Sequence, residues 1–215
     1  LRLRAPLRLS IRDISIAMGE GTPEWPGDTP FSCRWSWEIA RGESVNVSEI
    51  RSSPHVGTHA DAPLHVADDW PASHELPLEP FLGRAFVLGV DASLPLIEPA
   101  HLASLPSGRI ERLLLRTSQT IAAGTFPSSW PALSEPALRL LLSRGLRLLG
   151  VDSPSVDTRT STTLDIHKAL FAGGAYNIEN LDLRGVPDGE YELIALPLKI
   201  TAVDAAPVRA LLRSL

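Results

Sequence analysis

The sequence predicts a single α/β domain built from short elements, and three observations support this prediction. The chain has 215 residues, a length typical of one domain. Hydrophobic residues make up 44% of it and charged residues 21%, proportions that are ordinary for a protein with a buried core. Strand-length aliphatic segments outnumber helix-like segments, and the two kinds are interspersed. Because the chain also holds 19 prolines and 15 glycines, its elements should be short and its loops numerous.

Four segments are expected to be β-strands because each is a short run rich in aliphatic residues. In chain order they are 85–90, 113–117, 146–151 and 191–200. Interspersed with helices, these strands favour a mixed α/β domain over a helical bundle.

Two helices and one short helical turn are predicted. The first helix begins after Ser134, whose side chain suits an N-cap, has Pro136 in its first turn and ends at Gly145. The second covers 164–172, after a cluster of Ser and Thr residues, and stops at a pair of glycines. A weaker pattern over 98–104 predicts a further, short helix.

Composition and charge exclude several classes of protein. No uninterrupted apolar run approaches the ~20 residues of a membrane-spanning helix, so we expect no integral membrane protein. The formal net charge of −5 argues against nucleic acid as the main ligand, because phosphate binding requires a clustered basic surface.

The single cysteine and the first ten residues bear on location and domain bounds. Cys33 cannot form an intramolecular disulfide, so the fold does not depend on an oxidising compartment. The first residues alternate Leu and Arg without the apolar core and cleavage site of a signal peptide, and we therefore expect a cytoplasmic protein. Residues 1–10 are interpreted as an arm, a first strand or an artefact of the start site, and 11–215 as the folded domain.

Three of the six histidines and one aspartate fall within residues 53–65, which read S-P-H-V-G-T-H-A-D-A-P-L-H. The i, i+4 spacing of His55 and His59 suits a metal-binding helix, but two prolines and a glycine make a helix a poor choice. Because side chains alternate across an extended chain, a strand would place four polar side chains on one side. These four are His55, His59, Asp61 and His65. Gly57 lies on the same side and leaves room between the first two.

The chemistry of these side chains points to a metal site. Two imidazoles and a carboxylate form a ligand set that suits Zn²⁺, Mn²⁺ or Fe²⁺. Such a set leaves coordination positions open, as a catalytic site requires, and the two oxygens of Asp61 allow it to bridge two metal ions. The alternative, unrelated surface or core histidines, is the better interpretation of a lone histidine. Three histidines and an acid on one face within eleven residues favour the metal site.

The string H-x-G-T-H-x-D-A-P-x-H, from His55 to His65, resembles the signature of the cyclase family of metal-dependent amidohydrolases. Four other segments match the family in the same order and cover most of the chain after about residue 11. They are W-P-G-D-T-P at 25–30, L-D-I-H at 164–167, N-I-E-N-L at 177–181 and A-L-P-L at 195–198. The resemblance implies the family's swivelling β/β/α fold and a homodimer or larger homo-oligomer.

The resemblance also implies a dinuclear metal site. Taken alone, His167 in the second predicted helix would be a core histidine and Glu179 a surface glutamate. The family instead takes a histidine and a carboxylate for its second metal from these two motifs. One metal would then be held by His55, His59 and Asp61, and the other by Asp61, His167 and Glu179, with Glu179 in reach of both. The implied cofactor is Zn²⁺, two ions per subunit, with Mn²⁺ or another divalent metal as the alternative.

Two further residues are assigned to catalysis and substrate binding. His65 is expected to be the general base or proton shuttle, since an imidazole titrates near neutral pH. The spacing alone leaves a ligand role for His65 open, so this assignment rests on the resemblance. Trp25 would by itself be a packed loop anchor, and the resemblance makes it a contact to the aromatic part of the substrate.

The other tryptophans are expected in the core or at an interface. They are Trp35, Trp37, Trp70 and Trp130.

Within the family, the flanking segments favour the formamidase branch. The resemblance therefore implies hydrolysis of a small-molecule substrate, N-formyl-L-kynurenine, to L-kynurenine and formate in tryptophan degradation. A metal would lower the pKa of water towards about 7 for attack on the formyl carbon. His65 would then pass a proton to the aniline nitrogen, and the chain has no G-x-S-x-G motif for a serine nucleophile.

Two alternative functions remain open. One is another amide hydrolase of the same family, such as an enzyme that opens isatin. The other is a metal-binding protein without turnover. The presence of both His65 and Glu179 counts against the second alternative, because a storage site needs no free base.

Overall fold

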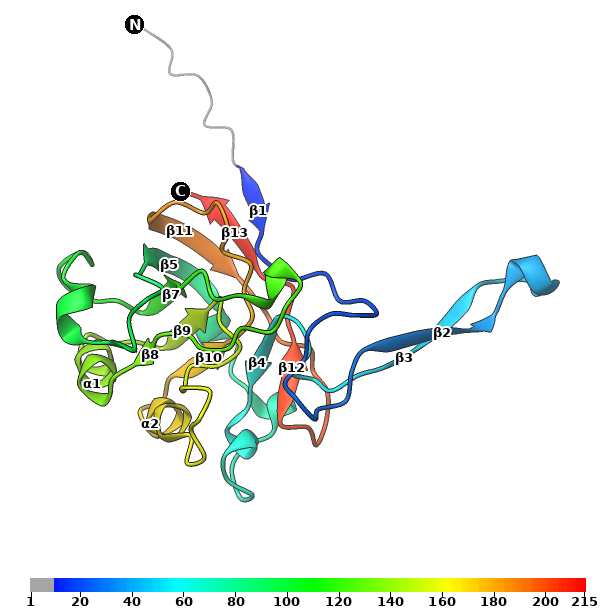
Figure 1. The fold of residues 1–215 in the computed structure, drawn as a ribbon, viewed down its shortest axis with the longest axis horizontal. Coiled ribbons are helices and arrows are strands. Elements are labelled where there is room, and N and C mark those ends of the chain that lie inside the picture. The colour runs from blue at the N-terminus through cyan, green and yellow to red at the C-terminus, as the bar shows by residue number, and fades with distance from the viewer. Residues whose placement is uncertain (1–9) are drawn as a thin grey trace, which may run out of the picture.

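A seven-stranded mixed sheet forms the centre of the computed structural model, which describes residues 10–215 (Figure 1). Its strands, in spatial order, are β1 (Ile11–Asp13), β13 (Leu211–Ser214), β11 (Gly189–Ile194), β5 (Leu82–Gly89), β7 (Arg112–Arg116), β9 (Leu148–Val151) and β10 (Tyr176–Ile178). The strands from β5 to β10 in this order run parallel, while β11, β13 and β1 are paired antiparallel. The predicted α/β class is therefore confirmed.

Three two-stranded sheets accompany the central sheet within residues 10–215. They pair β4 (His59–Asp61) with β12 (Ala205–Pro207), β2 (Ser32–Trp37) with β3 (Val47–Arg51), and β6 (Leu96–Ile97) with β8 (Ala132–Leu133). The β4–β12 pair lies next to β10 at the end of the central sheet (Figure 1). This position places the histidine-rich segment beside the carboxyl ends of the parallel strands.

The two predicted helices are confirmed. In α1 (Glu135–Ser143), the Ser134 side chain accepts a hydrogen bond from the N–H of Ala137, and Gly145 follows in the left-handed conformation. The second helix, α2 (Asp165–Ala172), agrees with the prediction to within one residue. The expected helix over 98–104 is only a 3-10 turn, Pro99–Leu102, because the chain bends again before Pro106.

The four predicted strands are present as β5, β7, β9 and β11. The first three overlap their predicted segments closely, whereas β11 starts two residues early and ends at Ile194 rather than at residue 200. The chain leaves the sheet after Ile194, and Pro197 has no N–H to donate to a neighbouring strand.

The inner strands β7 and β9 are buried on both faces, which explains why their sequences are continuous aliphatic runs. On β7, Leu114 belongs to one apolar cluster, while Leu113 and Leu115 belong to a second cluster on which α1 and α2 pack. All three leucines are fully buried. This packing anchors α2 and β10, the two elements next to the predicted site residues His167 and Glu179.

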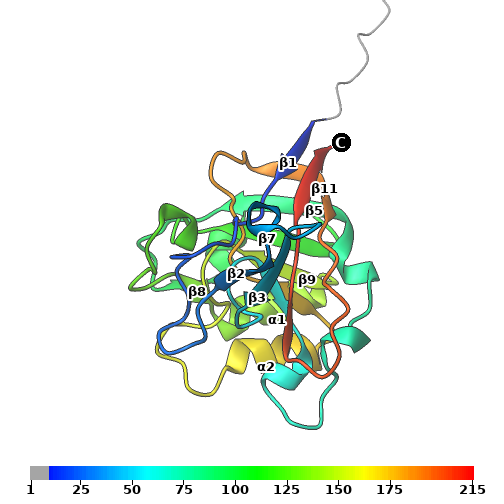
Figure 2. The ribbon, with the colours of Figure 1, turned by 90° about the vertical axis from the view of Figure 1, so that its right-hand side faces the viewer.

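The hairpin of β2 and β3 projects away from the rest of the molecule (Figure 1), and in Figure 2 it points toward the viewer. Every residue of both strands is exposed, and we call residues 32–51 the β2–β3 arm. Trp35 and Trp37 lie on this arm and Trp70 is also exposed, so a core position is wrong for these three tryptophans, and their place at an interface stays a prediction. Trp130 is buried, as expected.

Some expectations about the ends and the location of the protein stay predictions. Residues 1–9 lie outside the part of the chain that the structure describes, so the interpretation of residues 1–10 and the domain bound at 11 are untested. Within residues 10–215, none of the helices has the length and apolarity needed to cross a membrane. The cytoplasmic location remains an expectation from the sequence.

Candidate metal centre

Three segments that are far apart in the sequence meet at β4. This strand pairs with β12, so that Asp61 lies opposite Ala205. On its other side, the backbone N–H and C=O of His59 form hydrogen bonds of 3.3 and 3.0 Å with the backbone of Glu179. Backbone pairing therefore brings the histidine-rich segment, Glu179 and the residues before β12 together.

The histidine-rich segment is not the continuous strand that its alternation predicts. Residues 54–58 turn, only His59–Asp61 is a strand, and Pro63–His65 is a 3-10 helix. Gly57 has a φ of 72°, and a Cβ at this position would lie 2.7 Å from Cγ of Met18. The turn thus requires the glycine, which does not serve as a spacer between ligands. The predicted single face is wrong, but the turn and the 3-10 helix still direct both flanking histidines into one cavity.

The first group of potential metal ligands is the one that the sequence predicts: His55, His59 and Asp61. Nδ1 of His55 lies 3.0 Å and Nε2 of His59 lies 3.4 Å from Oδ1 of Asp61. The side chains of His59 and Asp61 are buried, whereas the His55 imidazole is partly exposed. Two imidazole nitrogens and one carboxylate oxygen thus converge within the distance that a single ion can span.

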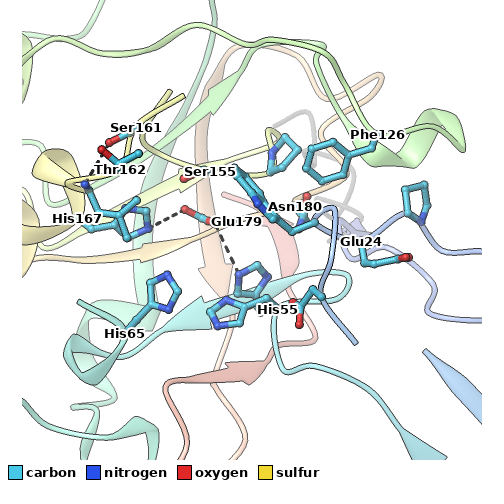
Figure 3. A pocket seen from close by; sticks show the side chains of 16 residues that line it. Glu24, His55, His65, Phe126, Ser155, Ser161, Thr162, His167, Glu179 and Asn180 are labelled. Atoms are coloured by element: carbon cyan, nitrogen blue, oxygen red, sulfur yellow. Dashed lines mark hydrogen bonds and ion pairs between the residues drawn. The ribbon is translucent and has the colours of Figure 1, made fainter. Parts of the chain in front are cut away.

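The second group also matches the prediction, and it consists of Asp61, His167 and Glu179. Nε2 of His167 lies 3.2 Å from Oδ2 of Asp61 and 3.1 Å from Oε1 of Glu179. Figure 3 shows the side chains of His167 and Glu179 pointing toward one another. Since Oδ1 of Asp61 faces the first group and Oδ2 the second, this carboxylate is placed to bridge two ions. Glu179 also reaches the first group, with Oε2 3.6 Å from Nε2 of His59.

In each imidazole of the two groups, one ring nitrogen faces the other ligands and the second, outer nitrogen contacts an oxygen acceptor. His55 contacts Asp204 through Nε2 at 2.9 Å, His59 contacts the carbonyl of Gly57 through Nδ1 at 2.9 Å, and His167 contacts Asp157 through Nδ1 at 2.6 Å. An N–H that donates to such an acceptor leaves the lone pair on the inner nitrogen, the form in which imidazole binds a metal. The arrangement therefore favours the tautomers in which these imidazoles could bind a metal ion.

Three residues that support the centre were missed at the level of sequence: Asp157, Asn177 and Asp204. Asp157 accepts the N–H groups of Ile166 and His167, so it caps α2 and orients the His167 ring at once. Asn177 donates to Oδ2 of Asp61 at 2.6 Å. Asn177 could have been found from the sequence, because it lies two residues before Glu179 at a strand, and residues two apart in a strand lie on the same face. Asp157 and Asp204 follow no comparable spacing.

The carboxylates and imidazoles of the centre shift one another's pKa values. Burial raises the pKa of the Asp61 carboxyl, but the surrounding histidines outweigh burial and hold this pKa well below its usual range. Burial lowers the pKa of His55, but the hydrogen bond to Asp204 and the neighbouring Asp61 carboxylate outweigh it and raise the pKa to about 10. For His167, burial is likewise outweighed by its carboxylate neighbours, and the pKa is raised. The centre thus strongly favours positive charge.

Two buried polar atoms show that the residues fit a metal ion. Nε2 of His59 and Oδ1 of Asp61 have no hydrogen-bond partner among residues 10–215. A buried polar atom without a partner is costly unless a ligand completes it. Nitrogen and carboxylate donors in groups of three are typical of catalytic zinc sites, which keep a position open for water. A divalent cation would give Nε2 of His59 and Oδ1 of Asp61 a partner, and its positive charge would offset the negative charge of the carboxylates around it.

A cavity of about 330 Å³ opens over the centre, and His65 lines it together with His55 and His167 (Figure 3). The His65 ring centroid lies 4.5 Å from that of His55 and 5.7 Å from that of His167. His65 belongs to neither of the two ligand groups that share Asp61. It forms a third group with His55 and Asp204, and Nδ1 of His65 lies 3.2 Å from Oδ2 of Asp204.

Trp25 lines the same cavity and is part of an aromatic cluster. Its ring lies edge-on to Phe126 and Trp130, with centroid distances of 5.5 and 5.9 Å. Arg159 lies over the Phe126 ring at 5.5 Å. The cavity therefore has one end lined by candidate metal ligands and an aromatic wall beside it, a combination that can accommodate a molecule with an aromatic ring.

The chain is similar to known proteins in both sequence and fold. A family model described as "Putative cyclase" matches residues 12–158. A kynurenine formamidase of Bordetella avium (strain 197N) is 46% identical over 203 residues, which cover 94% of this chain and 97% of that protein. Among solved structures, a potential metal-dependent hydrolase with cyclase activity has a TM-score of 0.82 at 27% identity, covering 96% of this chain and 98% of its own. Isatin hydrolase A from Labrenzia aggregata has a TM-score of 0.80 at 26% identity, covering 96% and 94%.

Proposed function

The chain belongs to the cyclase family, and on this premise we propose that it is a kynurenine formamidase, a metal-dependent hydrolase that converts N-formyl-L-kynurenine to L-kynurenine and formate. The observation that carries the proposal is the pair of ligand groups that share Asp61 beside an aromatic-walled cavity. The similarity to kynurenine formamidases extends over nearly the whole chain, which supports this substrate over a more general amide.

In the proposed site, His55, His59 and Asp61 would hold one divalent metal ion, and Asp61, His167 and Glu179 would hold the other. We propose Zn²⁺ for both positions, with Mn²⁺ as the alternative for the same nitrogen and oxygen donors. Bound metal would activate water for attack on the formyl carbon and polarise the carbonyl oxygen. Asn177 keeps the Asp61 and Glu179 carboxylates in place through its side-chain amide.

His65 is the proposed proton carrier of the reaction. It lies between His55 and His167 at the edge of the centre, and neither of the two ligand groups needs it. As general base it takes a proton from the attacking water, and as general acid it returns that proton to the aniline nitrogen when the C–N bond breaks. The products are then formate and the free aromatic amine. Trp25 is proposed to hold the aromatic ring of the substrate against the cavity wall.

Hydrolysis of N-formyl-L-kynurenine by purified protein of known metal content tests the proposal, with the absorbance of kynurenine as the signal. We expect turnover with two metal equivalents per chain, one for each ligand group, and loss of turnover on removal of metal by a chelator. Zinc added back should restore the activity. Isatin is the comparison substrate, because isatin hydrolase A shares the fold. A fully metallated protein that leaves formylkynurenine intact but opens isatin would overturn the proposal.

Substitution of Trp25 tests the proposed substrate contact. We expect Trp25→Ala to raise KM about tenfold, which corresponds to about 1.4 kcal/mol and lies in the range for a lost aromatic contact. Trp25→Phe, which retains a ring, should stay within about threefold of the wild type by the same reasoning. Steady-state kinetics of the three proteins decides the question, and a KM unchanged in Trp25→Ala removes this residue from the substrate site.

We propose a homodimer or larger homo-oligomer in which the β2–β3 arm contacts a second copy of the chain. Cys33, Trp35 and Ile50 share one face of the arm, while the Arg34–Glu49 ion pair lies on the other. An isolated two-stranded hairpin is marginally stable in water, and this one exposes large apolar side chains. Burial against a partner would stabilise the hairpin and remove its apolar side chains from water.

The arm proposal predicts the oligomeric state of two variants in sedimentation velocity experiments. Trp35→Glu places a charge on the apolar face and should convert the protein to monomers, since an interface core excludes unpaired charge. Glu49→Gln, on the opposite face, serves as the matched control and should leave the oligomer intact. A monomeric wild-type protein, or a Trp35→Glu variant with an unchanged sedimentation coefficient, would show that the arm is no interface.

A further inference from the structure

We propose that Asp204 is a positioning residue that orients His65 and the metal-ligating His55 through a single carboxylate oxygen. Oδ2 of Asp204 lies 2.9 Å from Nε2 of His55 and 3.2 Å from Nδ1 of His65. The inference rests on the proposed function, in which His65 moves a proton and His55 binds a metal. It links the proton carrier and the metal centre by one side chain.

The backbone around Asp204 is tied to the histidine-rich segment on both sides. The carbonyl oxygen of Asp204 accepts a hydrogen bond of 2.8 Å from the N–H of Ala62, the residue after Asp61. The preceding carbonyl, of Val203, accepts one of 3.0 Å from Ser73. Asp204 is also the last residue before β12, which pairs with β4. Its carboxylate is therefore held at a set distance from the segment that carries both histidines.

The chemistry of a carboxylate determines which nitrogen of each ring carries the proton. An ionised carboxylate only accepts hydrogen bonds, so both imidazoles donate an N–H to Asp204. A metal ion binds the neutral form of an imidazole, and in neutral His55 the lone pair would be on Nδ1, which lies 3.0 Å from Oδ1 of Asp61 in the first ligand group. The neutral His65 ring has its lone pair on Nε2, the atom left to take a proton. Asp204 thus selects the working tautomer of both rings.

The same oxygen also fixes how the two rings lie against each other. Their centroids are 4.5 Å apart and their planes are inclined by 46°. The His65 side chain is 27% exposed and has no other hydrogen-bond partner among residues 10–215. Without Asp204 this ring would be free to rotate. Each proton transfer would then carry the entropic cost of bringing the His65 ring into the reactive orientation.

Asp204→Ala in the zinc-loaded full-length protein tests the inference through three readouts. We expect kcat at saturating zinc to fall about 10- to 100-fold and zinc affinity, measured by competition with a chelating dye, to fall by a similar factor. KM should change by less than about threefold, because Asp204 lines no part of the aromatic wall. Nitrogen NMR of the His65 imidazole should show the Nδ1–H tautomer in the wild type and a mixture in the variant.

Two further variants separate a positioning role from a general structural one. Asp204→Asn keeps an oxygen acceptor and should recover part of kcat. Asp13→Ala removes a carboxylate of similar exposure that pairs with Arg209 outside the cavity, and it should leave kcat, zinc affinity and the His65 tautomer unchanged. In a His65→Ala background at saturating zinc, Asp204→Ala should lower the residual kcat by no more than about twofold, because its effect on turnover passes through His65.

The inference is overturned by any of three results. The first is an Asp204→Ala variant with wild-type zinc affinity and wild-type His65 tautomer. The second is a full additional loss of kcat in the His65→Ala background. The third is a third zinc equivalent in the wild type that Asp204→Ala removes, which would make Asp204 a ligand of the third group instead. Zinc affinity and the tautomer need no substrate, so they decide the role of Asp204 even if formylkynurenine is not hydrolysed.

Discussion

His65→Ala is expected to lower kcat for formamide hydrolysis by about 10²- to 10⁴-fold, the usual contribution of a general acid–base group. Both metal equivalents should remain bound, because His65 belongs to neither of the ligand groups that share Asp61. The variant loses the group that carries the proton from the attacking water to the aniline nitrogen. Parallel measurement of kcat and of metal content by elemental analysis checks both parts of the expectation.

A second histidine provides the matched control for this experiment. His101 is exposed, accepts a hydrogen bond from the N–H of Glu98 and lies outside the cavity, so His101→Ala should retain full turnover. Loss of metal together with activity in His65→Ala would instead assign His65 to the ligands, the role that its spacing in the sequence leaves open. Unchanged turnover in His65→Ala would show that His65 does not carry the proton.

Asp61→Asn is expected to abolish metal binding at both positions and to reduce turnover to the level of the metal-free protein. Asp61 is fully buried, and each of its oxygens belongs to a different ligand group. Without this carboxylate, the first group keeps His55 and His59 and the second keeps His167 and Glu179. Two protein ligands are fewer than the three that hold a catalytic zinc ion. Metal content after dialysis and residual turnover give the measurement.

Asp152→Asn is the matched control, because Asp152 is an equally buried carboxylate that does not line the cavity. It accepts hydrogen bonds from Thr117 and from the backbone of Ser118. This variant should keep both metal equivalents, and its circular dichroism reports whether loss of a buried carboxylate disturbs the fold. One metal equivalent retained by Asp61→Asn would show that Asp61 does not bridge the two groups.

Local patterns were sufficient to predict the helices and the inner strands. Ser134 and Gly145 bound α1 as expected because N-capping and the left-handed conformation depend on residues next to the helix end. The bounds of β11 were harder to predict, since a strand ends where its neighbours end, and these lie elsewhere in the chain. The exposed β2–β3 arm was not predicted, because nothing in its sequence distinguishes a projecting hairpin from a strand in a core.

Seven side chains were assigned to the site from the sequence, and all of them line the cavity or lie at its base: Trp25, His55, His59, Asp61, His65, His167 and Glu179. The clustering of histidines within 53–65 carries its own signal, whereas His167 and Glu179 were named only through the family resemblance. The extended face assumed for that segment was wrong because alternation describes a strand, and Gly57 instead makes a turn.

The sequence by itself determined which residue types are available as ligands and where the helices begin and end, because these depend on the residues themselves and on their neighbours. It also determined which family the chain resembles, through motifs spread along the chain. Only the tertiary structure decided that Asp157 orients His167 and that Asp204 lies between His55 and His65. Both aspartates reach the centre through contacts that no spacing in the sequence encodes. For Asp204, the physical reason is the pairing of β12 with β4, which joins residues more than a hundred positions apart.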